Sequence, residues 1–374
     1  MIFATFYFKI KISTLSYLIE ERSDFRCRRV LVLIEIIGAL FVHIGMSLYA
    51  GDVVFEIFFG INVITAILVI SIVTTIYTVL GGLKAVVVTE TIQSVILIIG
   101  AVILTGFGIF ALSDSGINSI TELKANLKPG QLSMLHTKDS LQALGGDTGL
   151  TWYACLLGYP ILGLWYWCSD QSIVQRVLVA KTKRDAQLGP IFAGFLKILP
   201  VFILVFPGVI AYVLFKDIIG TNANMTLPVM INELLPVGLK GLMAATLLEA
   251  LMSTIAAALN SSATLVAVDI VKRLNPKITD KSQIRIGRYA AVVVMVLAMA
   301  WSTQGDKFTS IFEAINKIAA AIAPPVAVVF LFGVFSKRGT RQAAFVTLLL
   351  GLFLGVVAFC FDFEPISGYM YITK

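Results

Sequence analysis

Charged residues are scarce in this chain of 374 residues, where Asp, Glu, Lys and Arg together make up only 14%. A soluble domain of this length carries roughly 25% charged residues to cover its surface. Hydrophobic residues reach 58%, and the mean hydropathy is +0.92. This composition excludes an ordinary soluble domain and predicts an integral membrane protein.

Histidine is nearly absent, since only His43 and His136 occur and they lie far apart in the sequence. A membrane-embedded enzyme, such as a lipid-processing transferase, needs acids or histidines clustered at one membrane face. No such cluster is present in the sequence, so we expect no enzymatic activity.

The cysteines are few and scattered, without CxxC spacing or a disulfide framework, which predicts free thiols. They are Cys27, Cys155, Cys168 and Cys360. The net charge of +7 does not indicate a nucleic-acid partner, because the Lys and Arg residues lie in short loops between apolar runs.

The sequence contains many long apolar runs. Runs near 20 residues long can cross a hydrocarbon core of about 30 Å. The runs are 30–50, 55–80, 91–112, 150–168, 191–215, 241–268, 289–301, 308–335 and 345–361. They predict an all-α, polytopic membrane protein with about nine transmembrane helices.

Basic residues alternate along these runs, and this pattern predicts the orientation. Clusters of Lys and Arg precede the first run and follow the second, fourth, sixth and eighth runs. The other loops, near Asp52 and over 113–149, 215–240 and 304–307, lack such clusters. Because cytoplasmic loops retain positive charge, residues 20–29 are expected in the cytoplasm and 113–149 outside.

Among the charged side chains inside the predicted spans are Lys197 in the fifth and Glu249 in the sixth, both well within their runs. A lysine at the bilayer centre costs about 3 kcal/mol. Lys197 therefore either faces a polar cavity or extends its ammonium to the interface, and position alone does not decide between the two.

Ser253 and Thr254 follow Glu249 by about one helical turn. Their hydroxyls and the Ala250 carbonyl offer the oxygen ligands that hard cations prefer. Alternatively, these small residues only let helices approach, with hydroxyls bonded to their own helix. Glu249 favours the cation site, because an intramembrane acid usually faces the protein interior.

Helix breakers recur inside the spans. Pro160 precedes the aromatic run at 165–167, Pro200 lies in the fifth span, and Pro324 and Pro325 lie in the eighth. Discontinuous helices expose backbone groups that transporters use as ligands, although single prolines also produce ordinary kinks. Together with the charged groups inside the spans, these breaks favour a carrier of a small solute.

The segment WYWCSDQSIVQRVLVAKTKRDAQ, at 165–187, resembles the signature of the sodium:solute symporter family, in its sodium/glucose cotransporter branch. Further stretches resemble the family in the same order. They are 75–93, 195–210, 241–270 and 322–338. The resemblance covers the chain from about Thr14 onward.

The resemblance implies a partial leucine-transporter-like inverted-repeat bundle that forms a single transmembrane domain over 1–374. Its segments are 14–112 as the later part of the first repeat, 113–149 as an extracellular loop, 150–335 as the second repeat and 336–374 as an additional C-terminal helix. We therefore expect the chain to be truncated at its N-terminus, and at its C-terminus as well, relative to the family.

The resemblance also implies site residues near the midplane. Ala250, Ser253 and Thr254 match sodium ligands, while Glu90 and the neighbouring Glu249 are a possible sodium pathway. Lys197 and Asn316 match solute contacts, and Tyr166 matches an aromatic gate below the solute. The predicted substrate-binding residues are therefore Tyr166, Lys197, Asn316, Trp165 and Trp167.

Two positions depart from the family pattern. Gly163 stands where sugar transporters carry a polar side chain, and Glu249 stands where a small residue is usual. One expected sugar contact is therefore missing.

These features predict a secondary active transporter, with Na⁺ as the coupling ion and a sugar as the foremost solute. Symport of an amino acid or a monocarboxylate remains an alternative, as does a non-transporting fragment or membrane sensor. The expected partners are the solute and membrane lipid, and the expected location is the cell membrane (inner or plasma), with several passes. The sequence leaves the oligomeric state open.

Overall fold

The computed structural model describes residues 2–10, 14–145, 150–308, 310–336 and 338–362. All regular structure in these ranges is helical. The α-helices are α1 (Ile2–Ile10), α2 (Leu15–Arg22), α3 (Phe25–Gly38), α4 (Met46–Phe59), α5 (Val63–Asp114), α6 (Ile120–Ala125), α7 (Lys138–Leu144), α8 (Trp152–Leu164), α9 (Gln171–Leu178), α10 (Lys183–Leu196), α11 (Phe206–Ile219), α12 (Thr226–Leu234), α13 (Val237–Thr264), α14 (Lys272–Leu274), α15 (Asp280–Ser302), α16 (Ile311–Phe335) and α17 (Arg341–Asp362).

Several helices contain or adjoin a wider π-helical turn or a tighter 3₁₀ turn. The π-helical turns are η1 (Ala39–Gly45), η2 (Trp165–Ser169), η3 (Val201–Val205) and η5 (Leu265–Val271). The 3₁₀ turns are η4 (Ala223–Met225) and η6 (Gly305–Lys307).

Eight helices of the described chain are long and apolar enough to cross a membrane. They are Phe25–Phe59, Val63–Gly82, Val86–Asp114, Lys183–Ile219, Val237–Leu274, Asp280–Ser302, Ile311–Phe335 and Arg341–Phe361. These correspond to eight of the nine predicted runs and confirm the all-α membrane fold. The remaining run, 150–168, is helical but shorter and rich in Trp and Tyr. The end of the predicted C-terminal segment, 363–374, lies outside the described residues.

The boundary between the first two spans differs from the prediction. Asp52 was expected in a loop, but it is buried inside α4 with 3% of its surface exposed. Helix α4 continues to Phe59 and ends at Gly60, whose φ of 63° suits a left-handed helix cap. The predicted separation of the second and third runs, 55–80 and 91–112, is present within α5, because Gly82 leaves helical geometry and divides this helix into two spans.

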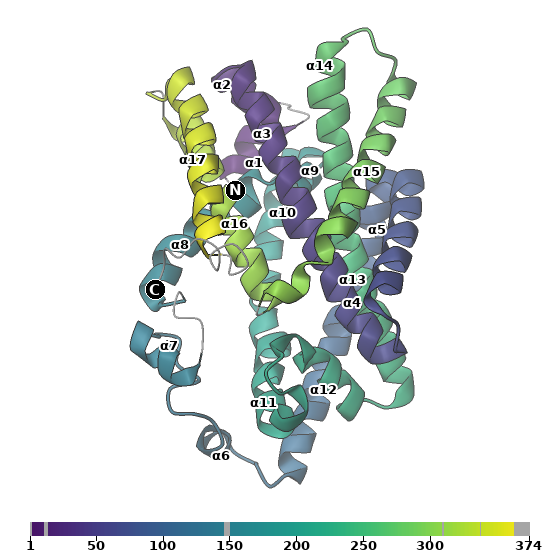
Figure 1. The fold of residues 1–374 in the computed structure, drawn as a ribbon, viewed down its shortest axis with the longest axis vertical. Helices are drawn as coiled ribbons and strands as arrows, with labels where there is room; N and C mark the ends of the chain where they lie inside the picture. Colours follow the sequence, from purple (N-terminus) through teal and green to yellow (C-terminus); the bar gives the residue numbers. More distant parts are fainter. Residues whose placement is uncertain (1, 11–13, 146–149, 309, 337, 363–374) are drawn as a thin grey trace.

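Helix α13 lies near the centre of the bundle and packs against α4, α5, α9, α15 and η1 (Figure 1). Its buried face contains small residues, which let neighbouring helices approach closely. They are Ala256, Ala257, Ala258, Ser261 and Ser262. The α14–α15 turn projects from one end of the molecule, and α11 and α12 lie toward the other (Figure 1).

A buried ion pair joins the beginning of the chain to the end of this central helix. Arg28 in α3, predicted within a solvated basic cluster, is only 5% exposed. Its Nε donates to Asp269 Oδ1 in η5 at 2.9 Å, and the Thr14 hydroxyl donates to the same oxygen at 2.8 Å. The pair fixes η5 against α3.

Helix α16 runs unbroken through Pro324 and Pro325, so the predicted break in the eighth span was wrong. Pro325 has no N–H to donate to the Ala321 carbonyl one turn earlier. Gly355 of α17 lies directly against that carbonyl, because a Cβ at Gly355 would be 1.9 Å from the Ala321 oxygen. Close packing of α17 thus covers the carbonyl that the proline leaves free.

We predict that Gly355→Ala lowers the melting temperature of the purified chain, because overpacking costs about 1–3 kcal/mol. The matched control is Gly158→Ala in α8, where an added Cβ meets no atom within 4 Å. The control should be neutral or slightly stabilising, since Ala favours helix over Gly. Equal melting temperatures for the two variants in detergent would contradict the close approach.

Candidate functional site

A break in the helical path at Asp170 defines the candidate site. Helix α8 runs through Pro160, so the break falls later than Pro160 suggested. After η2 the chain becomes extended at Asp170, with φ −76° and ψ 122°. Asp170 Oδ1 then accepts hydrogen bonds from the amides of Ser172, at 2.7 Å, and Ile173, at 3.3 Å, and thereby caps α9.

Buried polar contacts fix this broken segment to the first span. His43 Nε2, in the π-helical turn η1, lies 2.8 Å from Asp170 Oδ2, and both side chains are buried. The His43 ring stacks on Trp165, with centroids 6.2 Å apart and planes at 14°. The Gln171 amide donates to Glu35 Oε2 at 3.0 Å. The first span therefore sets the position of the break.

A cavity of about 400 Å³ opens beside the break, between η1, α5, η2, α9 and α13. Its walls include six of the predicted site residues, which are far apart in the sequence. They are Glu90, Tyr166, Trp167, Ala250, Ser253 and Thr254. The fold thus brings the predicted sodium ligands, the predicted gate and one predicted pathway acid to one place.

The predicted sodium ligands converge on a single carbonyl. Ser253 Oγ donates to the Ala250 oxygen at 3.0 Å, and Thr254 Oγ1 donates to the same oxygen at 3.2 Å. Three oxygen atoms therefore lie together on the cavity wall. Hard cations prefer oxygen ligands, so these atoms suit part of a cation's coordination shell. The same bonds also satisfy the two hydroxyls within their own helix, so the sodium site remains a prediction.

The two acids of the predicted sodium pathway have different surroundings. Glu90 forms an ion pair with Arg176, whose guanidinium nitrogen lies 2.7 Å from Glu90 Oε1. Arg176 also donates to the Ser172 carbonyl at 2.7 Å. The exposed Glu249 instead accepts a hydrogen bond from Gln93, which lines the cavity.

Three predicted solute contacts are not among the residues that line the cavity. Trp165 is buried in the core, 3.6 Å from the position of a Cβ on Gly38. The Lys197 ammonium lies 5.4 Å from the centroid of the Trp167 ring, just outside the wall. The Asn316 amide donates to the Phe312 carbonyl of its own helix at 2.8 Å. Their roles as solute contacts remain predictions.

Sequence reasoning missed the other eight residues of the cavity wall, of which five are polar or charged: His43, Gln93, Ser94, Ser172 and Arg176. His43 carried a usable signal, because an ionisable residue within an apolar run usually faces the protein interior. The sequence signal of Arg176 was misleading, because this residue belongs to the basic cluster that follows the fourth span. The structure instead places it on the amphipathic helix α9.

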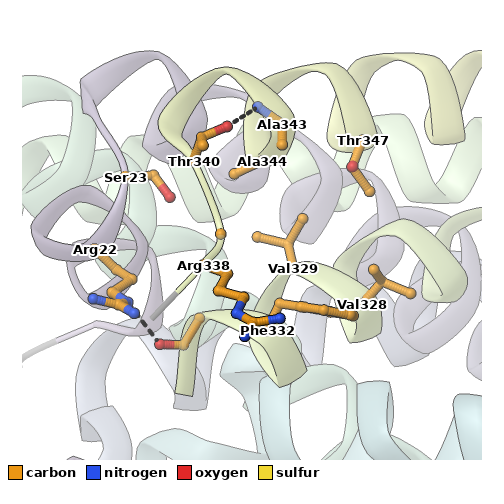
Figure 2. Close-up of a pocket in the computed structure, with 12 residues that line it drawn as sticks. Arg22, Ser23, Val328, Val329, Phe332, Arg338, Thr340, Ala343, Ala344 and Thr347 are labelled. Atoms are coloured by element: carbon orange, nitrogen blue, oxygen red, sulfur yellow. Dashed lines mark hydrogen bonds between the residues drawn. The ribbon is translucent and has the colours of Figure 1, made fainter. Parts of the chain in front are cut away.

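Another cavity of about 400 Å³ lies between the end of α2, α16 and α17 (Figure 2). One of its two arginines, Arg22, is already engaged, because Nε donates to the Gly333 carbonyl at 3.0 Å and a second nitrogen donates to the Ser336 carbonyl. None of the predicted site residues lines it. The cavity beside Asp170 is therefore the candidate functional site.

Secondary transporters are characterised by membrane-spanning helices that break beside a polar cavity. Oxygen ligands and charged groups line the wall of such a cavity. The chain belongs to the sodium:solute symporter family, whose family model matches residues 1–351. The predicted membership is thereby confirmed.

Curated relatives share about a third of their residues with the chain. It is 33% identical to the sodium/myo-inositol cotransporter 2 of Bos taurus, over 97% of this chain and 57% of that protein. It is 33% identical to the sodium/glucose cotransporter 2 of Rattus norvegicus, over 91% and 55%. The chain thus spans somewhat more than half the length of these relatives.

A solved structure has a similar fold. It is described as the substrate-bound, outward-open state of a Na⁺-coupled sialic acid symporter with a novel Na⁺ site. The TM-score is 0.74 at 22% sequence identity, and the match covers 96% of this chain and 78% of that one. This similarity confirms the leucine-transporter-like fold.

We predict that Asp170→Ala destabilises the chain by about 3 kcal/mol or more, because it leaves His43 buried without its partner. Asp217→Ala is the control, since Asp217 is an exposed acid in α11 and its loss should change stability by less than about 0.5 kcal/mol. Denaturant titration in mixed micelles measures both effects. A double-mutant cycle with His43→Ala should show coupling between the two residues, whereas purely additive effects would refute the pairing.

Proposed function

We propose that the chain works as a secondary active transporter that couples Na⁺ entry to the uptake of a small solute, foremost a sugar or a sugar-like polyol. The observation that carries this proposal is the convergence of the Ala250, Ser253 and Thr254 oxygens with Glu90 on one cavity at a helix break. The names of the relatives, which include glucose and myo-inositol cotransporters, support the choice of solute.

We further propose a location in the cell membrane and no enzymatic activity, in keeping with relatives that are cotransporters. Residues 14–112 and 150–335 would then belong to two repeats joined by the extracellular loop 113–149. Entry of one Na⁺ down 100 mV and a tenfold gradient yields about 2.3 + 1.4 kcal/mol. That free energy suffices for a few-hundredfold accumulation of solute.

The ion pair between Glu90 and Arg176 gives the pathway a physical rationale. An unpaired carboxylate in a half-enclosed site would hold Na⁺ tightly and slow its release. The positive charge of Arg176, 2.7 Å from Glu90, partly offsets the negative charge of that carboxylate. A passing Na⁺ is therefore attracted less strongly. Tyr166 and Trp167 lie on the same wall and would close the solute's side of the cavity.

We expect Na⁺ to raise the melting temperature of the purified chain above that measured in choline chloride. Sodium at about 100 times its dissociation constant stabilises the folded state by about 2.7 kcal/mol. The double variant Ser253→Ala plus Thr254→Ala should require at least tenfold more Na⁺ for the same shift, because two ligands are lost.

Thr91→Ala is the matched control, because Thr91 is exposed and its hydroxyl is bonded to the Val87 carbonyl of its own helix, away from the cavity. It should respond to Na⁺ like the unmodified chain. Identical Na⁺ titrations for the double variant and the control would rule out the proposed ligands. Sodium binding without solute uptake in proteoliposomes would instead favour the sensor alternative.

A solute with a carboxylate, such as an amino acid or a monocarboxylate, remains a second candidate. One observation favours it: the Lys197 ammonium lies over the Trp167 ring, and no ion pair of Lys197 is found within the described part of the chain. A solute carboxylate would give this ammonium an ion-pair partner, which a sugar hydroxyl does not supply.

A competition panel separates these two solutes. Glucose and myo-inositol should inhibit Na⁺-dependent solute uptake into proteoliposomes, while pyruvate and neutral amino acids should not inhibit it. Lys197→Ala should weaken inhibition by the sugar about tenfold, through loss of a charge-assisted hydrogen bond. Lys183→Ala, in the exposed first turn of the same helix, serves as the control. Inhibition by pyruvate alone would transfer the assignment to a carboxylate solute.

A further inference from the structure

A larger groove lies elsewhere on the molecule, between the first segment of α5, the α13–η5 helix and α15. It measures about 660 Å³ and shares no lining residue with the candidate functional site. Its walls are mainly apolar and include Val79, Leu259, Ala263 and Ile284. The groove therefore offers a separate surface within the membrane-spanning part of the chain.

The length of the groove indicates the size of its occupant. Leu259 and Lys272 mark its two ends along α13 and η5, a path of about 20 Å at the helical rise per residue. A free phosphate or a metal ion fills only a small part of such a path. A phospholipid fits it, because one leaflet of the hydrocarbon core is about 15 Å deep and the headgroup lies beyond it.

The charges at one end of the groove are predominantly positive. Lys272 and Arg288 line it there and are exposed, and neither forms an ion pair within the described ranges. Asp280 is the single carboxylate on the described walls. Two cations against one acid favour an anionic ligand.

The kink of α5 adds a second feature that attracts anions to the groove. Gly81 and Gly82 line the groove at the kink of α5, and the second segment of that helix starts just after them. Amides at a helix start attract phosphate. The basic loop that follows α13 predicts that the Lys272 end of the groove faces the cytoplasm, whose leaflet carries the anionic lipids.

Two polar groups deeper in the groove have no partner in the described chain. Thr78 is only 3% exposed, and its hydroxyl makes no hydrogen bond. The side-chain nitrogen of Asn260 is likewise buried and unpaired. Leaving such groups unsatisfied is costly, so an occupant with acceptor oxygens is favoured.

We propose that this groove binds one anionic phospholipid of the cytoplasmic leaflet. Its phosphate lies between Lys272 and Arg288, its ester oxygens accept from Thr78 and Asn260, and one acyl chain follows the apolar wall. The cavity of Figure 2, lined by Arg22 and Arg338, is a weaker candidate for the same lipid, because Arg22 is already bonded to two backbone carbonyls and none of the buried, unpaired polar groups of the described chain lines it.

Native mass spectrometry of the full chain tests this proposal. The chain, in detergent, is titrated with dioleoyl phosphatidylglycerol, with dioleoyl phosphatidylcholine or with inorganic phosphate. We expect one phosphatidylglycerol to be retained at least tenfold more strongly than phosphatidylcholine. The double variant Lys272→Ala plus Arg288→Ala should lose about tenfold in that affinity. Both residues are exposed, so the variant should fold.

The matched control is Lys277→Ala plus Lys281→Ala, which removes the same charge from the same region outside the groove. It should retain the lipid like the unmodified chain. Equal losses in both double variants would overturn the proposal in favour of diffuse attraction to basic residues. Equal retention of the two lipids, or full competition by inorganic phosphate, would overturn it as well. A second variant, Thr78→Val, should weaken retention several-fold without any change in charge.

Discussion

The structure depends on one requirement: a carboxylate buried among apolar helices must have partners. Asp170 is 2% exposed and meets this requirement twice, with His43 across the bundle and with the first amides of α9. Burial without partners would cost several kcal/mol. The pairing therefore locks the end of η2, and with it Tyr166 and Trp167, at a fixed distance from the first span.

Helix α13 contributes residues to both the candidate functional site and the groove proposed to bind a lipid. Its middle third supplies Ala250, Ser253 and Thr254 to the candidate functional site, and its later residues, continued by η5, form a wall of the basic groove. The Arg28–Asp269 pair clamps the same helix where η5 meets α3. Because a helix moves largely as a rigid body, a tilt at one surface is transmitted to the other.

The sequence predicted the fold well because apolar length and charge alternation are strong, local signals. It also predicted six residues of the cavity wall through their resemblance to a family. It did not predict the unbroken α16, because the carbonyl freed by Pro325 is covered by Gly355 from another helix. Nor did it predict the roles of His43 and Arg28, since each depends on a partner that is distant in the chain. Such pairings follow from packing rather than from local pattern.

The π-helical turns make the spans sensitive to the insertion or deletion of single residues. Each such turn accommodates an extra residue, which shifts every later side chain by about 100° around the helix axis relative to an uninterrupted α-helix. His43 lies within η1, so its direction depends on that widened turn. Deleting one residue from η1 would leave an apolar helix of nearly the same length, yet would rotate all of α4 onto different neighbours. Single-residue insertions and deletions are therefore a more drastic kind of change in these spans than most substitutions.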